Sequence, residues 1–523
     1  MSDHPKVFLY DTTLRDGTQG EGVNFSSLDK VRIAQELDEF GMDYIEGGWP
    51  GSNPKDVSFF ERAADLDWKH AKIAAFGSTR RKNTPVEDDP QVRTLLEAKT
   101  PVITFFGKSW RLHVTEVLGT TEEENQAMIL DTTRYLKEQG REVIYDAEHF
   151  FDGYKDAPEH AMATLAAAKE GGADWLVLCD TNGGTMPHEI AEMTETVVRE
   201  LGIPVGIHTH DDTGVGVGNA LASILAGATQ VQGTVNGYGE RVGNCNLTTV
   251  IPNLQLKMDR PLVGNIDKLS HLAHFVDDLA NCAHNIRAPY VGTTAFAHKG
   301  GMHVNAVQKV AHSFEHIEPG TVGNKQRILV SELSGQSNVL MKAEELGIPI
   351  EKGSDEAREI LQSLKDLEEQ GYEFETAEAS FELLIRKQLK TYNPFFDLKE
   401  YHCTYRHADD LDYQACSATV KAMVGDVEEY RVAEGDGPVN ALDAALRKAL
   451  RDKYPEIDEM ELQDYKVRII DSHLGTAAKT RVLILSSDGN ESWGTVGVSY
   501  NIIQASWIAL VDSVEYFLAK KQS

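Results

Sequence analysis

Apolar and polar positions alternate along the first half of the chain in two distinct patterns. Short apolar runs have the length of buried strands, and the stretches between them carry apolar residues every three or four positions, as amphipathic helices do. The stretch from Ser26 to Gly41 opens with a serine that can cap a helix and ends at a glycine that can stop one. Eight apolar runs predict strands at Lys6–Asp11, Asp43–Gly47, Ala71–Phe76, Pro101–Phe105, Arg141–Asp146, Asp174–Cys179, Ile203–His208 and Thr229–Val235.

Strands that alternate with helices form parallel βαβ units, and eight such units in roughly 250 residues match a TIM barrel. We therefore expect an α/β fold with a (β/α)8 TIM barrel over residues 1–270. Helical linker subdomains over 271–407 and a C-terminal α+β domain over 408–523 should follow it. A chain of 523 residues is long enough to bury the cores of several domains.

The C-terminal part repeats one pattern twice, after a stretch from Thr391 to His407 whose composition is typical of a linker. In each half, strands are followed by a short glycine-containing link and an amphipathic helix, which indicates an internal duplication. A repeated unit without a cluster of ionisable groups favours a regulatory or dimerising module over a second active site. The predicted elements are strands Ala418–Val424 and Glu428–Ala433 with helix Pro438–Lys453, then strands Lys466–Ile470, Thr480–Ser486 and Trp493–Val498 with helix Asn501–Leu518.

The composition narrows the range of partners. A formal net charge of −31 argues against nucleic acid and anionic membrane surfaces, and an anionic substrate would need local cations such as Arg15, Lys108 or a metal ion. The five cysteines form no CxxC pair, which fits a reducing cytosol. The N-terminus lacks a signal-peptide core, and no apolar run approaches the roughly 18 residues of a membrane helix, so we expect a cytoplasmic protein.

Polar or ionisable residues follow every predicted barrel strand, and TIM barrels place their chemistry in the loops at that face. The most informative group is His208-Thr209-His210, at the end of the seventh strand. Residues two apart on a strand point to the same side, so both imidazoles aim at one spot. Two imidazoles and a carboxylate suit a divalent cation with open coordination positions. The sequence therefore predicts a metal site at this face.

The fifth predicted strand ends in two carboxylates, Asp146 and Glu148, that also lie two residues apart. Both should point into the mouth of the barrel. Two nearby carboxylates raise one pKa and can divide acid and base work between them. The mouth is therefore expected to hold an active site.

These residues resemble the motifs of barrel enzymes that perform Claisen condensations on 2-oxoacids, a family that includes 2-isopropylmalate, homocitrate and citramalate synthases. The C-terminal duplication resembles the family's amino-acid-binding regulatory domain, so the resemblance spans nearly the whole chain. The shared motifs are Asp11–Gly17, His208–Asp212 and Gly243-Asn244, and those most similar to the citramalate synthase subgroup are Phe76–Arg81, Gly107–Trp110 and Gly494–Val498.

The resemblance implies that acetyl-CoA condenses with pyruvate and that the thioester is hydrolysed, giving (R)-citramalate and CoA for isoleucine biosynthesis. It also implies a divalent metal cation held by Asp16, His208 and His210, with Asn244 at or near the fourth position. Magnesium, manganese, cobalt and zinc remain open. The family further implies a homodimer and an allosteric amino acid, isoleucine with leucine as the alternative, although a plain dimerisation module is also compatible with the duplication.

The resemblance assigns roles at the oxoacid. Arg15 should face the ketone oxygen, where negative charge develops, unless it serves only in an ion pair with a neighbouring carboxylate. Thr181 resembles the residue that hydrogen-bonds the oxoacid carboxylate, and a turn or helix-cap threonine is its alternative. Asp146 is expected among the substrate-binding residues. Glu148 aligns with an active-site glutamate, or else orients Arg15 or a histidine.

Family enzymes also use a histidine from the helical subdomain, often contributed by the partner chain. His303 is the best match and His298 the second choice. Several relatives pair this histidine with a tyrosine, but residues 322–335 contain none. The group that deprotonates the acetyl methyl, or that activates the hydrolytic water, is therefore left open.

Four other functions fit part of the pattern. Two histidines and a carboxylate also describe non-haem iron oxygenases, although nothing else supports redox chemistry. An acyl-CoA lyase would carry a cysteine in the loop after the eighth strand, and Gly237–Gly243 has none, although Cys245 follows Asn244. A non-enzymatic amino-acid sensor would not need the metal-site residues. The 2-isopropylmalate synthases are the nearest alternative, and the volume of the oxoacid pocket separates them from enzymes that act on pyruvate.

Overall fold

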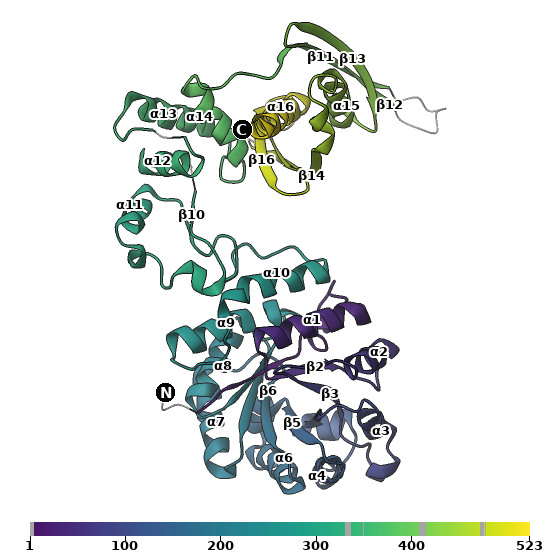
Figure 1. Ribbon diagram of the computed structural model, residues 1–523. Helices are drawn as coiled ribbons and strands as arrows, with labels where there is room; N and C mark the ends of the chain where they lie inside the picture. The colour runs from purple at the N-terminus through teal and green to yellow at the C-terminus, as the bar shows by residue number, and fades with distance from the viewer. Residues whose placement is uncertain are drawn as a thin grey trace. The chain divides into compact units, whose positions relative to one another are not determined.

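The chain folds into two compact units, shown in the computed structural model of Figure 1. The structure describes residues 5–329, 336–348, 350–406, 415–470, 475 and 477–522. The first unit comprises Met1–Phe296 and Ile317–Lys325, and the second comprises Ala297–His316 and Gln326–Ser523. Each unit is described by itself.

The first unit is a closed barrel of eight strands in the order of the sequence, in which neighbouring strands run parallel. Pairing of β1 with β8 closes the ring, with Leu9 opposite Val231. All eight predicted strands are confirmed, with ends that differ by a few residues. They are β1 Phe8–Asp11, β2 Tyr44–Gly48, β3 Lys72–Ser78, β4 Val102–Lys108, β5 Glu142–Glu148, β6 Trp175–Asp180, β7 Val205–Thr209 and β8 Gln230–Gly233.

Helices surround this barrel (Figure 1). The predicted helix after Ser26 forms as α1, where Ser26 accepts from the Asp29 backbone N–H and Gly41 ends the helix in the left-handed conformation. The helices of the first unit are α1 Ser27–Phe40, α2 Pro54–Ala63, α3 Pro90–Glu97, α4 Glu122–Glu138, α5 Phe150–Asp156, α6 Pro158–Gly171, α7 Pro187–Leu201, α8 Gly216–Leu225, α9 Leu247–Pro252 and α10 Leu269–Ala280.

Two apolar layers hold the barrel. The larger layer lies between strands and helices, and the smaller is made by alternate strand residues, such as Trp175, Val177 and Cys179 on β6. Residues that alternate along a strand share a face, so this smaller layer fills the interior of the barrel. The interior is thus packed, and polar side chains gather where the strands end.

The second unit begins with short elements and helices that lead to two sheets. A two-stranded sheet pairs β9 with β10 in parallel, and the helices that follow pack into an apolar core together with Val496 of the C-terminal part. The elements are β9 Ala297–His298, α11 Gly301–Lys309, β10 Arg327–Ile328, α12 Gln336–Glu345, α13 Asp355–Glu369 and α14 Glu378–Gln388.

The C-terminal duplication is confirmed, and each copy is a three-stranded antiparallel sheet followed by a helix. The prediction that Thr391–His407 is a linker is wrong, because Asp397–Arg406 forms a strand that pairs with β12. The predicted boundary between 407 and 408 lies outside the described residues. The elements are β11 Asp397–Arg406, β12 Ala415–Val424, β13 Val427–Gly435, α15 Pro438–Leu450, β14 Glu461–Ile469, β15 Thr480–Ser487, β16 Ser492–Ser499 and α16 Ile502–Lys521.

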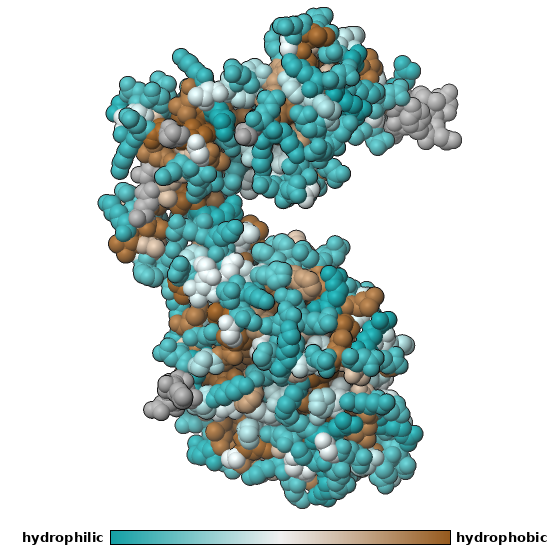
Figure 2. Space-filling view, viewed as in Figure 1, coloured by the Kyte–Doolittle hydropathy of each residue, from teal (hydrophilic) through white to brown (hydrophobic). Residues whose placement is uncertain are grey.

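The last helix, α16, bears on the expectation that no apolar run approaches the length of a membrane helix. Its 20 residues are long and apolar enough to span a membrane, by length and composition alone. More than half of that apolar window is buried, however, and Leu510, Val514 and Phe517 pack in the core that the two sheets share. The apolar residues of α16 are therefore explained by this core. On the face shown in Figure 2, hydrophilic side chains dominate the surface, in keeping with the net charge of −31.

Candidate active site

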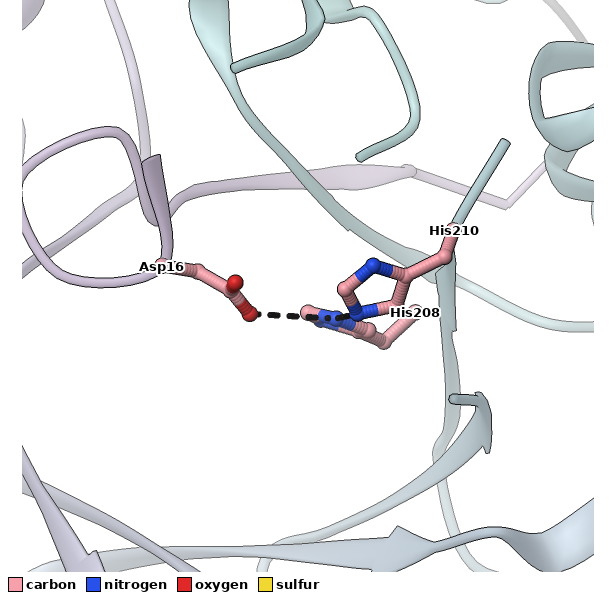
Figure 3. Close-up of side chains that lie close together, drawn as sticks. All are labelled: Asp16, His208 and His210. Atoms are coloured by element: carbon pink, nitrogen blue, oxygen red, sulfur yellow. Dashed lines mark hydrogen bonds and ion pairs between the residues drawn. The ribbon is translucent and has the colours of Figure 1, made fainter. Parts of the chain in front are cut away.

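Three predicted ligands converge where the barrel strands end. Asp16 lies in the loop after β1, His208 lies on β7, and His210 follows that strand. Asp16 Oδ2 and His208 Nε2 are 3.5 Å apart, and His208 Nε2 and His210 Nε2 are 3.4 Å apart. Each residue offers one ligand atom, and these atoms all lie within 4.8 Å of one another (Figure 3). The three side chains thus form a candidate metal site.

Asn244 lies beside this group. His210 and Asn244 form an isolated antiparallel bridge, which brings the asparagine to the end of β7. Its amide Nδ2 donates to the Tyr238 carbonyl over 3.1 Å, and its Oδ1 is buried without a hydrogen-bond partner, as is Asp16 Oδ1. Buried oxygen atoms are rarely left unpaired in proteins. The donor set of two nitrogen atoms and two unpaired oxygen atoms fits a divalent cation.

The protonation states also suit ligands. Burial, together with the neighbouring His208, lowers the pKa of His210 to about 4, and burial lowers the pKa of His208 as well. Burial opposes ionisation of Asp16, but Arg15 and the two imidazoles outweigh it and lower the pKa of this carboxyl to about 2. Neutral imidazoles and an ionised carboxylate are the forms that bind metal ions.

A glutamine that the sequence reasoning missed orients His208. Gln232 lies opposite His208 in the pairing of β7 with β8, and its Oε1 is 3.0 Å from His208 Nδ1. An amide oxygen only accepts, so Nδ1 carries the proton and Nε2 presents its lone pair to Asp16 and His210. Gln232 Nε2 donates in turn to Asp146 Oδ1 over 3.1 Å. Asp146 is thus placed in the mouth as predicted, with burial and the Glu46 charge raising its pKa well above the ordinary value.

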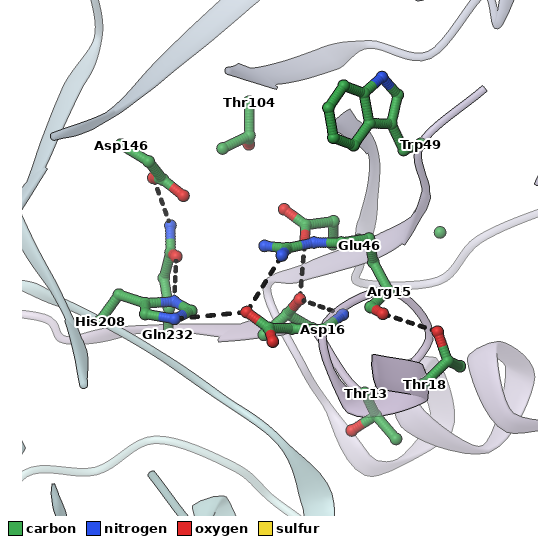
Figure 4. Close-up of polar contacts among 12 residues, drawn as sticks. Thr13, Arg15, Asp16, Thr18, Glu46, Trp49, Thr104, Asp146, His208 and Gln232 are labelled. Atoms are coloured by element: carbon green, nitrogen blue, oxygen red, sulfur yellow. Dashed lines mark hydrogen bonds and ion pairs between the residues drawn. The ribbon is translucent and has the colours of Figure 1, made fainter. Parts of the chain in front are cut away.

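Arg15 lies between two carboxylates and an aromatic ring. Its Nε donates to Glu46 Oε1 over 2.6 Å and its Nη1 to Asp16 Oδ2 over 3.0 Å (Figure 4). The guanidinium carbon lies 3.7 Å from the centre of the Phe76 ring. The side chain is 12% exposed, so the planar group is held in one orientation and still reaches the cavity. Arg15 therefore forms ion pairs with neighbouring carboxylates, which was the alternative to a role at the ketone oxygen. Its position in the cavity also allows contact with a ligand.

Glu46 is the anchor of this arrangement and was not among the predicted site residues. It is fully buried in the middle of β2 and accepts from the Tyr10 hydroxyl, the Thr12 hydroxyl and Arg15. Its place near the end of the predicted strand, next to glycines, was the only signal in the sequence. Three donors, of which Arg15 is the cationic one, make Glu46 a fixed acceptor that holds Arg15.

Glu148 and Thr181 lie on the other side of the mouth, and each has a defined partner. Glu148 Oε2 forms an ion pair with Lys108 Nζ. Thr181 Oγ1 accepts from the His149 backbone N–H over 2.9 Å, and His149 has a left-handed conformation with φ of 56°. Because the threonine oxygen is occupied as an acceptor, its O–H is free to donate to a ligand.

All the predicted site residues except Asn244 and His303 line one cavity of about 200 Å³. The rings of Phe76 and Phe106 stack at 5.6 Å, and Trp49 meets both edge-on, so an aromatic wall lines part of the cavity. The cavity is lined by Arg15, Asp16, Gln19, Trp49, Phe76, Phe106, Asp146, Glu148, Cys179, Thr181, His208, His210 and Glu240. A small anion fits this combination of cations, hydrogen-bond donors and apolar surface.

The two histidines predicted from the helical part belong to the second unit. His303, on α11, is exposed and stacks on Phe314 at 4.2 Å. His298, on β9, is buried, with Nε2 3.0 Å from Glu315 Oε1. His303 is the more accessible of the two, and its participation at the barrel mouth stays a prediction.

Family models match the chain in three successive stretches. The HMGL-like model matches residues 6–276, which contain the barrel and every ligand of the candidate metal site. The model described as homocitrate synthase post-HMGL domain-like matches residues 290–372, and the LeuA allosteric (dimerisation) domain model matches residues 375–518.

Curated relatives share nearly the full length of the chain. The (R)-citramalate synthase of Aquifex aeolicus is 54% identical over 520 residues, which cover 99% of this chain and 98% of the relative. That of Synechocystis sp. is 52% identical over 526 residues, covering 98% and 96%. The 2-isopropylmalate synthase of Methanocaldococcus jannaschii is 29% identical over 521 residues, covering 99% and 96%.

Proposed function

We propose a reaction for this chain on the premise that it belongs to the family of the (R)-citramalate synthases. The acetyl group of acetyl-CoA is joined to pyruvate, and the thioester is hydrolysed, giving (R)-citramalate and CoA. A proton leaves the acetyl methyl group, the resulting carbon atom attacks the ketone carbon, and water then cleaves the thioester. The full-length similarity to curated citramalate synthases is the observation that carries this assignment.

Asp16, His208 and His210 would hold a divalent cation, with Asn244 beside them, and a cation bound there would polarise the ketone as a Lewis acid. Arg15 donates to the ketone oxygen, where negative charge develops during attack. Its orientation is set by Glu46 and the Phe76 ring, so little reorganisation opposes that role.

The Thr181 hydroxyl donates to the pyruvate carboxylate. The Thr181 oxygen already accepts from the His149 backbone N–H, which orients the hydroxyl. Two groups are candidates for moving the methyl proton. Glu148 lines the cavity with Lys108 beside it, and His303 lies on α11 of the second unit. Hydrogen exchange of the acetyl methyl group with solvent, measured in Glu148→Gln and His303→Gln, distinguishes the two candidates. Exchange should be abolished only in the variant that has lost the proton acceptor.

The nearest alternative acceptor is 2-oxoisovalerate, the substrate of a 2-isopropylmalate synthase. One observation favours pyruvate: the chain is 54% identical to a citramalate synthase and 29% identical to the M. jannaschii enzyme.

The deciding experiment measures CoA release from acetyl-CoA with pyruvate, 2-oxobutanoate and 2-oxoisovalerate in turn, with the product identified by mass spectrometry. We expect the highest kcat/KM with pyruvate. A preference for 2-oxoisovalerate would contradict the assignment. A lyase reaction is disfavoured because Cys245 is fully buried, which raises the pKa of its thiol to about 12.

We further propose that the C-terminal domain mediates dimerisation and binds isoleucine, the end product of the pathway that citramalate feeds. The match of residues 375–518 to the LeuA allosteric (dimerisation) domain supports both roles. The five unpaired cysteines support a reducing compartment, the cytoplasm.

A further inference from the structure

We propose that Asp277, on α10, is a positioning residue for the metal site, because it holds the loop that presents Asn244. The inference rests on the proposed metal site and adds a residue that touches neither metal nor substrate. The loop, residues 234–244, follows β8 and carries Asn244 at its end. Helix α10 lies outside the barrel, so the link joins the active face to the helix layer.

The Asp277 carboxylate is 6% exposed, and both of its oxygen atoms are used. Oδ1 accepts from Asn236 Nδ2 over 2.5 Å and from the Tyr238 hydroxyl, and Oδ2 lies 2.9 Å from His284 Nδ1. Asn236 also donates to the Ala273 carbonyl of α10 over 2.8 Å. Burial and the Asp277 charge raise the pKa of Tyr238 well above its ordinary value, so the phenol remains a donor. One carboxylate thus fixes two neighbouring points of the loop.

From Tyr238 the link continues to the metal site. The Tyr238 carbonyl accepts from Asn244 Nδ2 over 3.1 Å, and the Gly237 carbonyl accepts from the Asn244 backbone N–H over 3.0 Å. With Nδ2 engaged in this way, the Asn244 amide is held in one orientation, and its Oδ1 is buried without a hydrogen-bond partner. Rotating the Tyr238 peptide would therefore release the Asn244 amide from this orientation.

The loop needs an external anchor because its own conformation is strained. Asn236 and Arg241 have φ of 61° and 58°, in the left-handed region that is unfavourable for residues other than glycine. Strand pairing within this described stretch is limited to isolated bridges at its two ends, Thr234 and Asn244. The far end is tied by the exposed pair of Arg241 and Asp212, whereas Asp277 supplies the buried anchor at the near end.

The test is the affinity for Co²⁺ of the full-length protein, stripped with a chelator and titrated while the visible absorption of bound cobalt is recorded. Asp277→Ala removes the anchor, and Tyr238→Phe removes only one hydroxyl. The matched control is Asp38→Ala, because Asp38 is also buried and accepts three backbone N–H groups, from Lys69, His70 and Ala71, on the outside of the barrel. Thermal midpoints are measured for each variant.

We expect Asp277→Ala to weaken Co²⁺ binding about tenfold, the lower end of what partners of metal ligands contribute. Tyr238→Phe should also weaken Co²⁺ binding. The double variant should bind Co²⁺ as tightly as Asp277→Ala does, because the two changes break the same link. Asp38→Ala should lower the thermal midpoint without changing the affinity. If Asp277→Ala fails to fold, the Co²⁺ affinity of Tyr238→Phe alone tests the proposal.

Affinities within twofold of wild type in both variants would overturn the positioning role and leave the proposed reaction untouched. A wild-type protein that binds no Co²⁺ would overturn the metal site itself, and this inference with it. The two failures are therefore distinguished by the wild-type titration.

Discussion

His208 Nδ1 and Gln232 Oε1 lie 3.0 Å apart on neighbouring strands, and this contact leaves the other ring nitrogen of His208 facing Asp16. The tautomer of a ligand residue is thus set by a side chain that does not itself reach the metal site. Two other site residues are also oriented by a neighbour: Glu46 forms an ion pair with Arg15, and the His149 backbone N–H donates to Thr181.

Replacing His210 with alanine should abolish both metal content and turnover while the fold remains. The apolar layer inside the barrel lies below the ligands and does not depend on them. Metal content is measured by elemental analysis after dialysis, and the fold by circular dichroism. His188→Ala, at an exposed position on α7, is the control and should keep its metal. A His210→Ala protein that retained metal and most activity would refute the ligand assignment.

Arg15→Lys should lower kcat about 10²- to 10³-fold, the loss seen when one donor to a developing oxyanion is removed. Lysine cannot bond Glu46 and Asp16 through a planar fork, so the charge shifts away from the ketone oxygen. KM for pyruvate should change much less. Steady-state kinetics measure both, with the exposed Arg199→Lys as control. Equal losses in kcat for the two variants would exclude the proposed role of Arg15.

Thr181→Val should raise KM for pyruvate by roughly 10- to 100-fold, because a hydrogen bond to a charged group contributes about 1.5–3 kcal/mol. Thr181→Ser keeps the hydroxyl and the acceptor for the His149 N–H, so it should behave like wild type. Initial rates at varied pyruvate separate the two variants. Equal impairment of the serine and valine variants would contradict the proposed role, because serine keeps the hydroxyl.

Asp146→Asn should stabilise the protein increasingly as the pH rises. Burial raises the pKa of Asp146 in the folded protein above its ordinary value of 3.8, so folding favours the protonated acid. The stability from this group is full below the unfolded pKa and is lost as pH rises through the folded pKa, by about 1.4 kcal/mol per pH unit. Urea unfolding of wild type and variant between pH 4 and pH 8 measures the difference. A gap that stayed constant across this range would contradict the buried acid.

Isoleucine should inhibit the intact enzyme and leave a protein truncated after residue 372 active but insensitive. That cut lies between the stretches matched by the post-HMGL and LeuA domain models. A cut near residue 408 would remove β12 from its partner β11, and the cut after residue 372 removes α14 from the core that it shares with α12 and α13. Inhibition constants for isoleucine, with leucine and valine as controls, provide the measurement. Equal inhibition of both proteins would place the effector outside the C-terminal domain.

The parts predicted best were those that depend on local spacing. The period of two along β7 placed His208 and His210 on one side, and the strand ends identified Asp16, Asp146 and Glu148. Apolar runs also located all eight barrel strands, because a strand buried on both faces is apolar throughout.

The parts that were missed depend on pairing between distant segments. Gln232 gains its role only from the register that sets it opposite His208, and Glu46 gains its role from Arg15. Strand β11 was not predicted from the sequence for another reason. Its alternation of Leu398, Tyr401 and Cys403 is interrupted by a register shift between Leu398 and Glu400, and charged residues cover its exposed edge.

Closure of the barrel by β1 and β8 has a consequence for the order of folding. Asp16 follows the first strand to leave the ribosome, while His208, His210 and Asn244 belong to the last two strand ends of the ring. Contacts between such distant segments form late, after the intervening chain has been synthesised and ordered. A nascent chain that stops before β8 contains the carboxylate and both imidazoles but has no closed ring to hold them together. Uptake of metal would therefore mark the completed barrel during synthesis.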